Sequence, residues 1–188
     1  IQGIGLHDFK FTDWKVDAVV GGSHKWLTAP VGLGFLALKK EHIPKFKPRL
    51  IGSMTYGTCD DPSQLDCIPK MDATKYENSS KQILEITAFG VAVDLILKTG
   101  TQVIRNYACD LAMHLTEKLL SKGYQLHTST NNLVVPMVNF SSSKYSNQDI
   151  RNKLSSISAN CALRGPGVRL SPHAFNTKSE VDQLFQVL

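Results

Sequence analysis

The chain has 188 residues, of which 42% are hydrophobic and 20% are charged. This balance excludes a disordered or collagen-like chain, and the length is enough to bury a sizeable core. The four cysteines are scattered, without the close pairs of zinc sites, and no apolar run reaches the roughly 20 residues that span a bilayer. We expect a soluble, cytoplasmic protein with reduced thiols, no metal site and no membrane contact.

A formal net charge of +5 raises the alternative of a nucleic-acid-binding module. The basic residues cluster between positions 39 and 49: Lys39, Lys40, Lys45, Lys47 and Arg49. The same stretch contains two prolines and a single phenylalanine, so it has neither helical periodicity nor a row of aromatic side chains for stacking bases. A solvated loop is therefore favoured, and no nucleic-acid partner is expected.

Two short apolar runs near the start of the chain predict buried strands. They cover residues 16–21 (VDAVVG) and 32–38 (GLGFLAL). The segment between them follows the carboxyl end of the first strand, which is where α/β sheets usually bind ligands. Polar residues in this segment are therefore candidates for a functional site.

Two long helices are predicted after a loop-like stretch at 44–69. Apolar residues recur with helical spacing over 82–98, Gly100 interrupts the pattern, and the spacing resumes over 103–120. The second helix ends near Gly123, since glycine commonly follows a helix C-terminus.

Shorter elements follow and predict a small α+β domain. The predicted strands are 133–140, 159–163 and 168–171, and a helix is predicted at 147–154. Thr177 and Glu180 have the spacing of a capping box, which predicts the start of a final helix. We divide the chain into residues 1–100, a connecting long helix at 101–122, and residues 123–188.

The segment after the first strand has a distinctive sequence, SHKWLTAPVGLGFL, from Ser23 to Leu36. It resembles the cofactor-lysine segment of class V aminotransferases, the pyridoxal-phosphate family that includes cysteine desulfurases and isopenicillin-N-epimerase-like enzymes. The resemblance implies that Lys25 holds pyridoxal 5′-phosphate as a Schiff base. It also implies that His24 and Ser23 contact the cofactor, with Ser23 replacing a serine that the family places one residue earlier, where this chain has Gly22.

Three further matches follow the order of the family. Gln2 lies 23 residues before Lys25, like the family's glutamine that bonds the cofactor's phenolic oxygen. Residues 76–82 (YENSSKQ) resemble the segment whose threonine reaches the phosphate of the neighbouring subunit, so Ser80 is the corresponding hydroxyl, although a helix N-cap explains this serine equally well. Residues 168–182 (VRLSPHAFNTKSEVD) place Arg169 as the arginine that binds the substrate carboxylate.

The resemblance implies an α/β protein, the C-terminal part of a fold-type-I pyridoxal-phosphate-dependent transferase: the remainder of the large domain followed by a small α+β domain. It implies a homodimer that acts on an α-amino acid through a Cα carbanion, with transamination, racemisation and elimination left open. The family's pyridine-binding Asp would fall two positions before Ile1, so we expect further sequence upstream. We also expect the 188 residues alone to bind the cofactor poorly.

Two alternatives qualify this reading. A desulfurase needs a nucleophilic cysteine on a mobile loop, but Cys161 lies in a predicted strand that runs directly into Arg164, which favours a structural thiol. The chain could instead be a truncated or degenerate relative that serves as a scaffold or a dimerisation unit.

Overall fold

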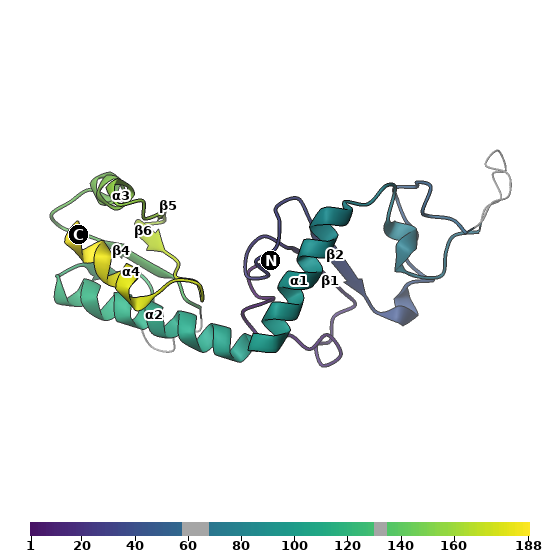
Figure 1. Ribbon diagram of the computed structural model, residues 1–188, viewed down its shortest axis with the longest axis horizontal. Coiled ribbons are helices and arrows are strands. Elements are labelled where there is room, and N and C mark those ends of the chain that lie inside the picture. Colours follow the sequence, from purple (N-terminus) through teal and green to yellow (C-terminus); the bar gives the residue numbers. More distant parts are fainter. Residues whose placement is uncertain (58–67, 130–134) are drawn as a thin grey trace. The chain divides into compact units, whose positions relative to one another are not determined.

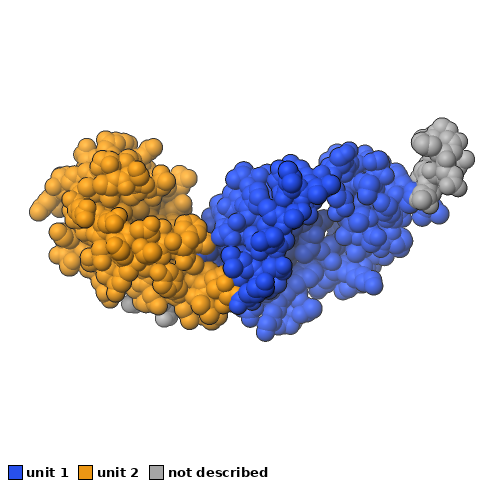
Figure 2. Space-filling model, viewed as in Figure 1, with its two compact units in different colours: residues 1–98 blue, residues 99–188 orange. Residues whose placement is uncertain are grey.

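The computed structural model describes residues 1–57, 68–129 and 135–188. They form two compact units, Ile1–Lys98 and Thr99–Leu188, which Figure 2 colours separately. The predicted loop at 44–69 and the predicted strand at 133–140 each fall partly outside the described residues. Cys59 and Cys67 lie outside them.

The first unit contains a two-stranded antiparallel sheet and one long helix (Figure 1). Its elements are β1 (Ala18–Gly22), β2 (Gly34–Leu38), the short 3₁₀ helices η1 (Lys40–His42) and η2 (Ala73–Tyr76), and α1 (Ile83–Thr99). The register pairs Val20 with Leu36 and Gly22 with Gly34. The residues between the two strands therefore form one wide hairpin loop.

The two strands are less buried than their apolar sequences predict. Val20 and Leu36 face each other across the hairpin, yet 71% and 45% of their surfaces are exposed. On the other face, the rings of Phe35 and Phe89 of α1 lie 6.4 Å apart. The prediction of fully buried strands was wrong for these 188 residues, because the described part of the chain covers only one face of the hairpin.

Helix α1 is apolar around most of its circumference, and of its residues only Ile96 is buried. Its large exposed apolar side chains are Ile83, Leu84, Ile86, Val91, Leu95 and Leu97. A helix that is hydrophobic on all sides is normally buried in the assembled protein. This surface is therefore available for packing against further polypeptide.

The second unit is a four-stranded antiparallel sheet with three helices. Its elements are α2 (Thr101–Ser121), β3 (Gln125–Leu126), β4 (Val138–Ser141), α3 (Asn147–Ser156), β5 (Ala162–Arg164), β6 (Gly167–Leu170), α4 (Lys178–Gln183) and the 3₁₀ helix η3 (Leu184–Gln186). The strand order is β3-β4-β6-β5. Strand β3 is too short to give a sequence pattern and was not predicted.

A single apolar core joins the helices to one face of this sheet. Val138 and Phe140 of β4 and Val168 of β6 are fully buried, as are Leu115 of α2 and Ile150 of α3. Since side chains alternate along a strand, Asn139 and Arg169 lie on the opposite face. The core thus leaves that face free for polar groups.

The predicted helix boundaries agree closely with those of the structure. Gly100, with φ of 87°, separates α1 from α2, and Gly123, with φ of 80°, follows the end of α2. The capping box of Thr177 and Glu180 is confirmed at the start of α4. Among the described residues, no helix is long and apolar enough to cross a membrane.

Candidate cofactor and substrate site

The loop between β1 and β2 is held in shape by Ser23, which is fully buried. Its hydroxyl donates to the Pro30 carbonyl oxygen at 2.6 Å and lies 3.1 Å from the Leu33 carbonyl oxygen. Its backbone N–H donates to Leu33, and its carbonyl accepts from Ala29, both at 3.1 Å. Because its one hydroxyl proton is used inside the loop, Ser23 organises the backbone here.

Lys25 lies at the outer turn of this loop. Its carbonyl accepts a hydrogen bond from the N–H of Thr28 at 2.9 Å, and Thr28 has a positive φ of 50°, so the chain turns sharply just after the lysine. Trp26 and Leu27 are buried, with 9% and 7% of their surfaces exposed. The backbone on both sides of Lys25 is therefore anchored, while its side chain is exposed to solvent.

Three predicted cofactor ligands have polar atoms without a partner in the described part of the chain. The side chains of Gln2, His24 and Lys25 are exposed, and none of them forms a hydrogen bond or ion pair with another described residue. The ring of His24 lies beside Gly22, since a Cβ built there would be 3.4 Å from His24 Cε1. The amine of Lys25 and the polar side-chain atoms of Gln2 and His24 are therefore available to a bound group such as pyridoxal phosphate, which needs an amine and hydrogen-bond partners.

Ser80 lies between η2 and α1 and is exposed. The segment before it is fixed by Tyr76, whose hydroxyl donates to the Phe46 carbonyl oxygen at 2.8 Å. An ion pair of 2.5 Å joins Lys81 to Glu77 across the serine. Helix α1 begins only at Ile83, three residues after Ser80, so the alternative in which Ser80 caps this helix loses support.

Arg169 lies in the middle of the second sheet, between Asn139 of β4 and Ala162 of β5. Its Nε atom is buried and has no hydrogen-bond partner among the described residues. Neither does the buried side-chain oxygen of Asn139, its neighbour across the strands. A buried guanidinium N–H without an acceptor is costly and suits a carboxylate ligand.

The loop after Arg169 is tied down by Asn176. Its side-chain oxygen accepts from the N–H of His173 at 2.9 Å, and its carbonyl accepts from the hydroxyl of Tyr107 of α2 at 3.1 Å. The rings of His173 and Phe175 stack with their centroids 4.3 Å apart. Burial lowers the pKa of His173, which favours its neutral imidazole.

Cys161 precedes β5 and packs against the core of the second unit. Burial raises the pKa of its thiol, which disfavours the nucleophilic thiolate. This environment agrees with the structural role expected from the sequence.

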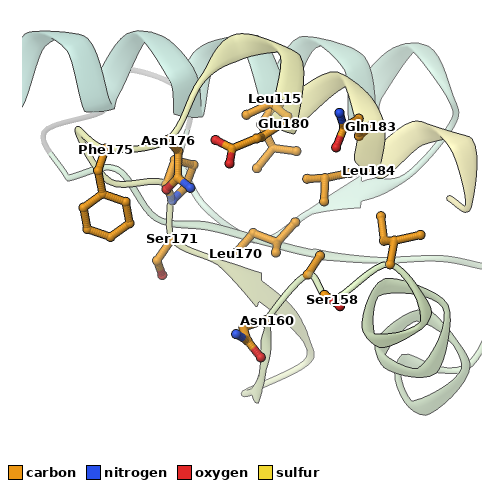
Figure 3. Close-up of a pocket in the computed structure, with 14 residues that line it drawn as sticks. Leu115, Ser158, Asn160, Leu170, Ser171, Phe175, Asn176, Glu180, Gln183 and Leu184 are labelled. Carbon is orange, nitrogen blue, oxygen red and sulfur yellow. The ribbon is translucent and has the colours of Figure 1, made fainter.

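A cavity of about 390 Å³ lies on the core side of the second sheet (Figure 3). Leu115 of α2, Leu170 of β6 and Leu184 line it. Arg169 adjoins Leu170 in the strand and therefore points to the other face. The cavity is thus separate from the predicted carboxylate site.

The structure places Ser23, His24 and Lys25 on one loop and Gln2 in the same unit, whereas Arg169 belongs to the second unit. Sequence reasoning did not identify Asn139, which pairs with Arg169 across the strands and whose side-chain oxygen is buried. Its only signal is the pairing of β4 with β6, which a single sequence does not reveal. No group of described residues has the composition of a metal site.

Residues 1–184 match the family model for class-V aminotransferases, so the chain belongs to this family of pyridoxal-phosphate enzymes. An uncharacterized aminotransferase, YcbU, from Bacillus subtilis (strain 168) is 25% identical over 96% of this chain and 47% of its own length. A second, C777.03c from Schizosaccharomyces pombe, is 23% identical over 65% of this chain and 32% of its own length. The chain spans about half the length of YcbU and about a third of the length of C777.03c.

Solved structures give the same fold. An apo cysteine desulfurase from Thermococcus onnurineus NA1 matches with a TM-score of 0.87 and 21% identity, over 99% of this chain and 49% of that chain. The cystine C–S lyase C-DES, in complex with cysteine persulfide, matches with a TM-score of 0.82 and 18% identity, over 99% and 50%. A lysine-to-alanine mutant of C-DES, with glycine covalently linked to its pyridoxal phosphate, matches with a TM-score of 0.81 and 16% identity, over 99% and 49%.

Proposed function

We propose that this chain is part of a pyridoxal-phosphate-dependent enzyme that acts on an α-amino acid, with Lys25 as the residue that binds the cofactor covalently. The observation that carries the proposal is the Lys25 amine, which is exposed and has no partner in the described residues although the backbone around it is anchored. We assign residues 1–100 to the large cofactor-binding domain, 101–122 to a connecting helix and 123–188 to the small domain.

Pyridoxal phosphate, when bound, supplies an aldehyde that condenses with amines and a ring that accepts the electron pair released at the amino-acid Cα. Lys25 anchors this group, and its amine removes or returns the proton at Cα. The planar guanidinium of Arg169 binds the substrate carboxylate through two parallel hydrogen bonds and so fixes the orientation of the amino acid.

Three other residues of the first unit contribute to the proposed cofactor site. Gln2 donates to the phenolic oxygen of the cofactor, and His24 donates to its phosphate. Ser23 acts through the loop, because its hydroxyl already bonds Pro30. Its part in binding phosphate is therefore limited to placing its neighbours His24 and Lys25.

Among reactions that begin at Cα, we favour transamination, epimerisation or elimination over desulfuration. A desulfurase needs a thiolate that reaches the substrate sulfur. Burial raises the pKa of Cys161, and its side chain packs against the core. This environment disfavours the thiolate that desulfuration requires.

We also propose a homodimer in which Ser80 reaches the phosphate site of the second subunit. Ser80 is exposed and lies three residues before α1, whose apolar side chains are largely uncovered. A surface of this kind is stabilised by burial against another subunit.

Borohydride reduction tests the proposal. The chain is incubated with pyridoxal phosphate, reduced and digested, and the modified lysines are quantified by mass spectrometry. Lys25 is expected to be modified well above every other lysine, even if the total yield is low, because it lies on the anchored loop that we propose to hold the cofactor. Lys25→Ala should remove the dominant product, whereas Lys15→Ala, at another exposed lysine, should leave it unchanged.

Equal modification of Lys25 and of scattered surface lysines would contradict the proposal. That result would favour the alternative in which this chain is a relative without catalysis of its own.

A further inference from the structure

A tight turn follows Gln2 at the start of the chain. The N–H groups of Leu6 and His7 both donate to the carbonyl of Gly3, at 3.1 and 2.9 Å. Gly5 lies inside this turn with φ of +93°, a conformation that side chains other than glycine's rarely adopt. The turn therefore depends on glycine at position 5 for its backbone conformation.

The turn also packs directly on the backbone of the lysine loop. A Cβ atom built on Gly5 would lie 2.6 Å from the carbonyl oxygen of Trp26, 2.7 Å from its carbonyl carbon and 3.1 Å from the nitrogen of Leu27. These are backbone atoms, so they cannot move aside as the end of a flexible side chain can. Any residue larger than glycine must separate the two segments.

The contact between Gly5 and Trp26 lies close in sequence to Gln2 and Lys25, the two residues whose relative position the proposed function requires to be fixed. Gly5 lies three residues after Gln2, and Trp26 directly follows Lys25. Leu6 on the turn is 1% exposed, and Trp26 is 9% exposed, so the contact is sealed from water. The lysine loop itself is stiff, because Ser23 bonds it internally at Pro30 and Leu33.

We propose that Gly5 is a positioning residue, which fixes the backbone of Lys25 relative to the segment that carries Gln2. The consequence for Lys25 chemistry rests on the function proposed above, whereas the contact between Gly5 and Trp26 does not. Gly5 touches neither substrate nor cofactor in this proposal; it acts through the backbone of Trp26.

Tryptophan fluorescence tests the contact without any cofactor. The chain contains only two tryptophans, so Trp14→Phe leaves Trp26 as the sole emitter. In that background Gly5→Ala should shift the emission to longer wavelength and increase acrylamide quenching, because the added Cβ displaces the backbone that buries Trp26. Far-UV circular dichroism should retain the helical signal.

Two control variants separate positioning from general destabilisation. Gly3→Ala alters the same turn, but a Cβ there would meet only His7, at 4.0 Å. Ile43→Ala removes a buried side chain from the first unit outside both segments. Neither should shift Trp26 emission in the folded chain. The proposal is overturned if Gly5→Ala leaves the emission unchanged, or if both controls shift it equally.

Borohydride labelling then measures the consequence at Lys25. Gly5→Ala should lower the share of label on Lys25 by about tenfold or more, since small misplacements of a reacting group have large effects on rate. Gly3→Ala should preserve it. If the unaltered chain shows no preference for Lys25, the proposed function fails, while the fluorescence result still decides the contact.

Hydrogen exchange of the unaltered chain covers the case in which Gly5→Ala does not fold. The amides of Leu6 and His7 in the turn, and of Thr28 and Ala29 in the lysine loop, are hydrogen-bonded. If Gly5 joins the two segments, these amides should open in one cooperative step with equal protection. Protection of the loop amides alongside free exchange of the turn amides would refute the proposal.

Discussion

Lys25 is distinguished by its backbone and not by any partner of its amine. Its carbonyl bonds Thr28, and the next residue, Trp26, is buried against the turn of Gly5. Such an arrangement positions an amine without consuming its hydrogen-bonding capacity, as covalent binding of a carbonyl group requires. The sequence motif suggests this lysine, and the anchored backbone around it is compatible with the proposed role.

The proposed role of Arg169 gives a prediction at the residue scale. Arg169→Lys should weaken L-alanine binding to the pyridoxal-phosphate-loaded chain by about tenfold or more, because an ammonium lacks the two parallel donors of a guanidinium. The measurement is the absorption change of the cofactor as L-alanine is titrated. Arg164→Lys, on the neighbouring strand but exposed, is the matched control and should leave the titration unaltered. A normal titration of Arg169→Lys would remove this residue from the site.

Cys161 gives a second prediction at this scale. In a chain where Cys59 and Cys67 are replaced by serine, Cys161 should react slowly with a thiol reagent at pH 8, because burial raises its pKa. Cys161→Ser should leave Lys25 labelling unchanged and cost about 1–2 kcal/mol of stability through burial of a hydroxyl. Rapid reaction of Cys161, together with loss of Lys25 labelling in Cys161→Ser, would restore the hypothesis that the enzyme is a desulfurase.

At the scale of elements, helix α4 is fastened to α2 by charge. Asp182 accepts from His114 Nε2 at 2.6 Å and from Lys118 Nζ at 2.5 Å. A hydrogen bond from Lys118 and a weaker effect of the one from His114 hold the pKa of Asp182 below its ordinary value. At the start of the same helix, the backbone N–H of Thr177 lowers the pKa of Glu180. Both carboxylates therefore favour the folded state when ionised.

This gives a pH dependence with a definite sign. A lowered carboxylate pKa contributes stability above the ordinary value, and that contribution disappears as the pH falls through the folded-state pKa. The urea midpoint of the second unit should therefore drop as the pH falls below about 5. Asp182→Asn should flatten this drop, whereas Asp110→Asn, at an exposed site on α2, should not. An equal drop in the Asp182→Asn variant would contradict the assignment.

The hairpin of β1 and β2 shows that a sequence can predict the position of a strand without predicting its burial. The apolar runs locate β1 and β2 to within two residues, because β-branched and large apolar side chains favour strands whatever covers them. Burial is a different matter, since it depends on what packs on each face. Phe35 has Phe89 beside it, but Val20 and Leu36 have one face open among the described residues.

At the scale of the molecule, many large apolar side chains are exposed among the described residues, and clustered exposed apolar groups commonly mark surfaces that associate. In the first unit this surface includes the pair Val20 and Leu36 and most of α1. We expect the 188-residue chain to associate with increasing concentration in sedimentation velocity experiments. Val20→Thr combined with Leu36→Thr should weaken association, whereas Phe175→Ser, which removes an exposed ring from the second unit, should not. A concentration-independent monomer would contradict this expectation.

The sequence by itself determines the local features of this protein. Helix ends follow from Gly100, Gly123 and the capping box at Thr177, and the family follows from the order of the motifs around Gln2, Lys25 and Arg169. These signals lie in short stretches of chain, because capping and turn geometry depend on neighbouring residues.

Only the tertiary structure decided the features that join distant segments. The pairing of Asn139 with Arg169, which brings its unpartnered side-chain oxygen beside that strand position, depends on strand register, and the contact of Gly5 with Trp26 joins residues 21 positions apart. The commitment of the Ser23 hydroxyl to Pro30 likewise depends on how the loop folds back. Such contacts are set by packing, which a single sequence does not encode in any local pattern. For Lys25, the motif suggests the proposed chemistry, and the tertiary structure shows how the backbone around it is anchored.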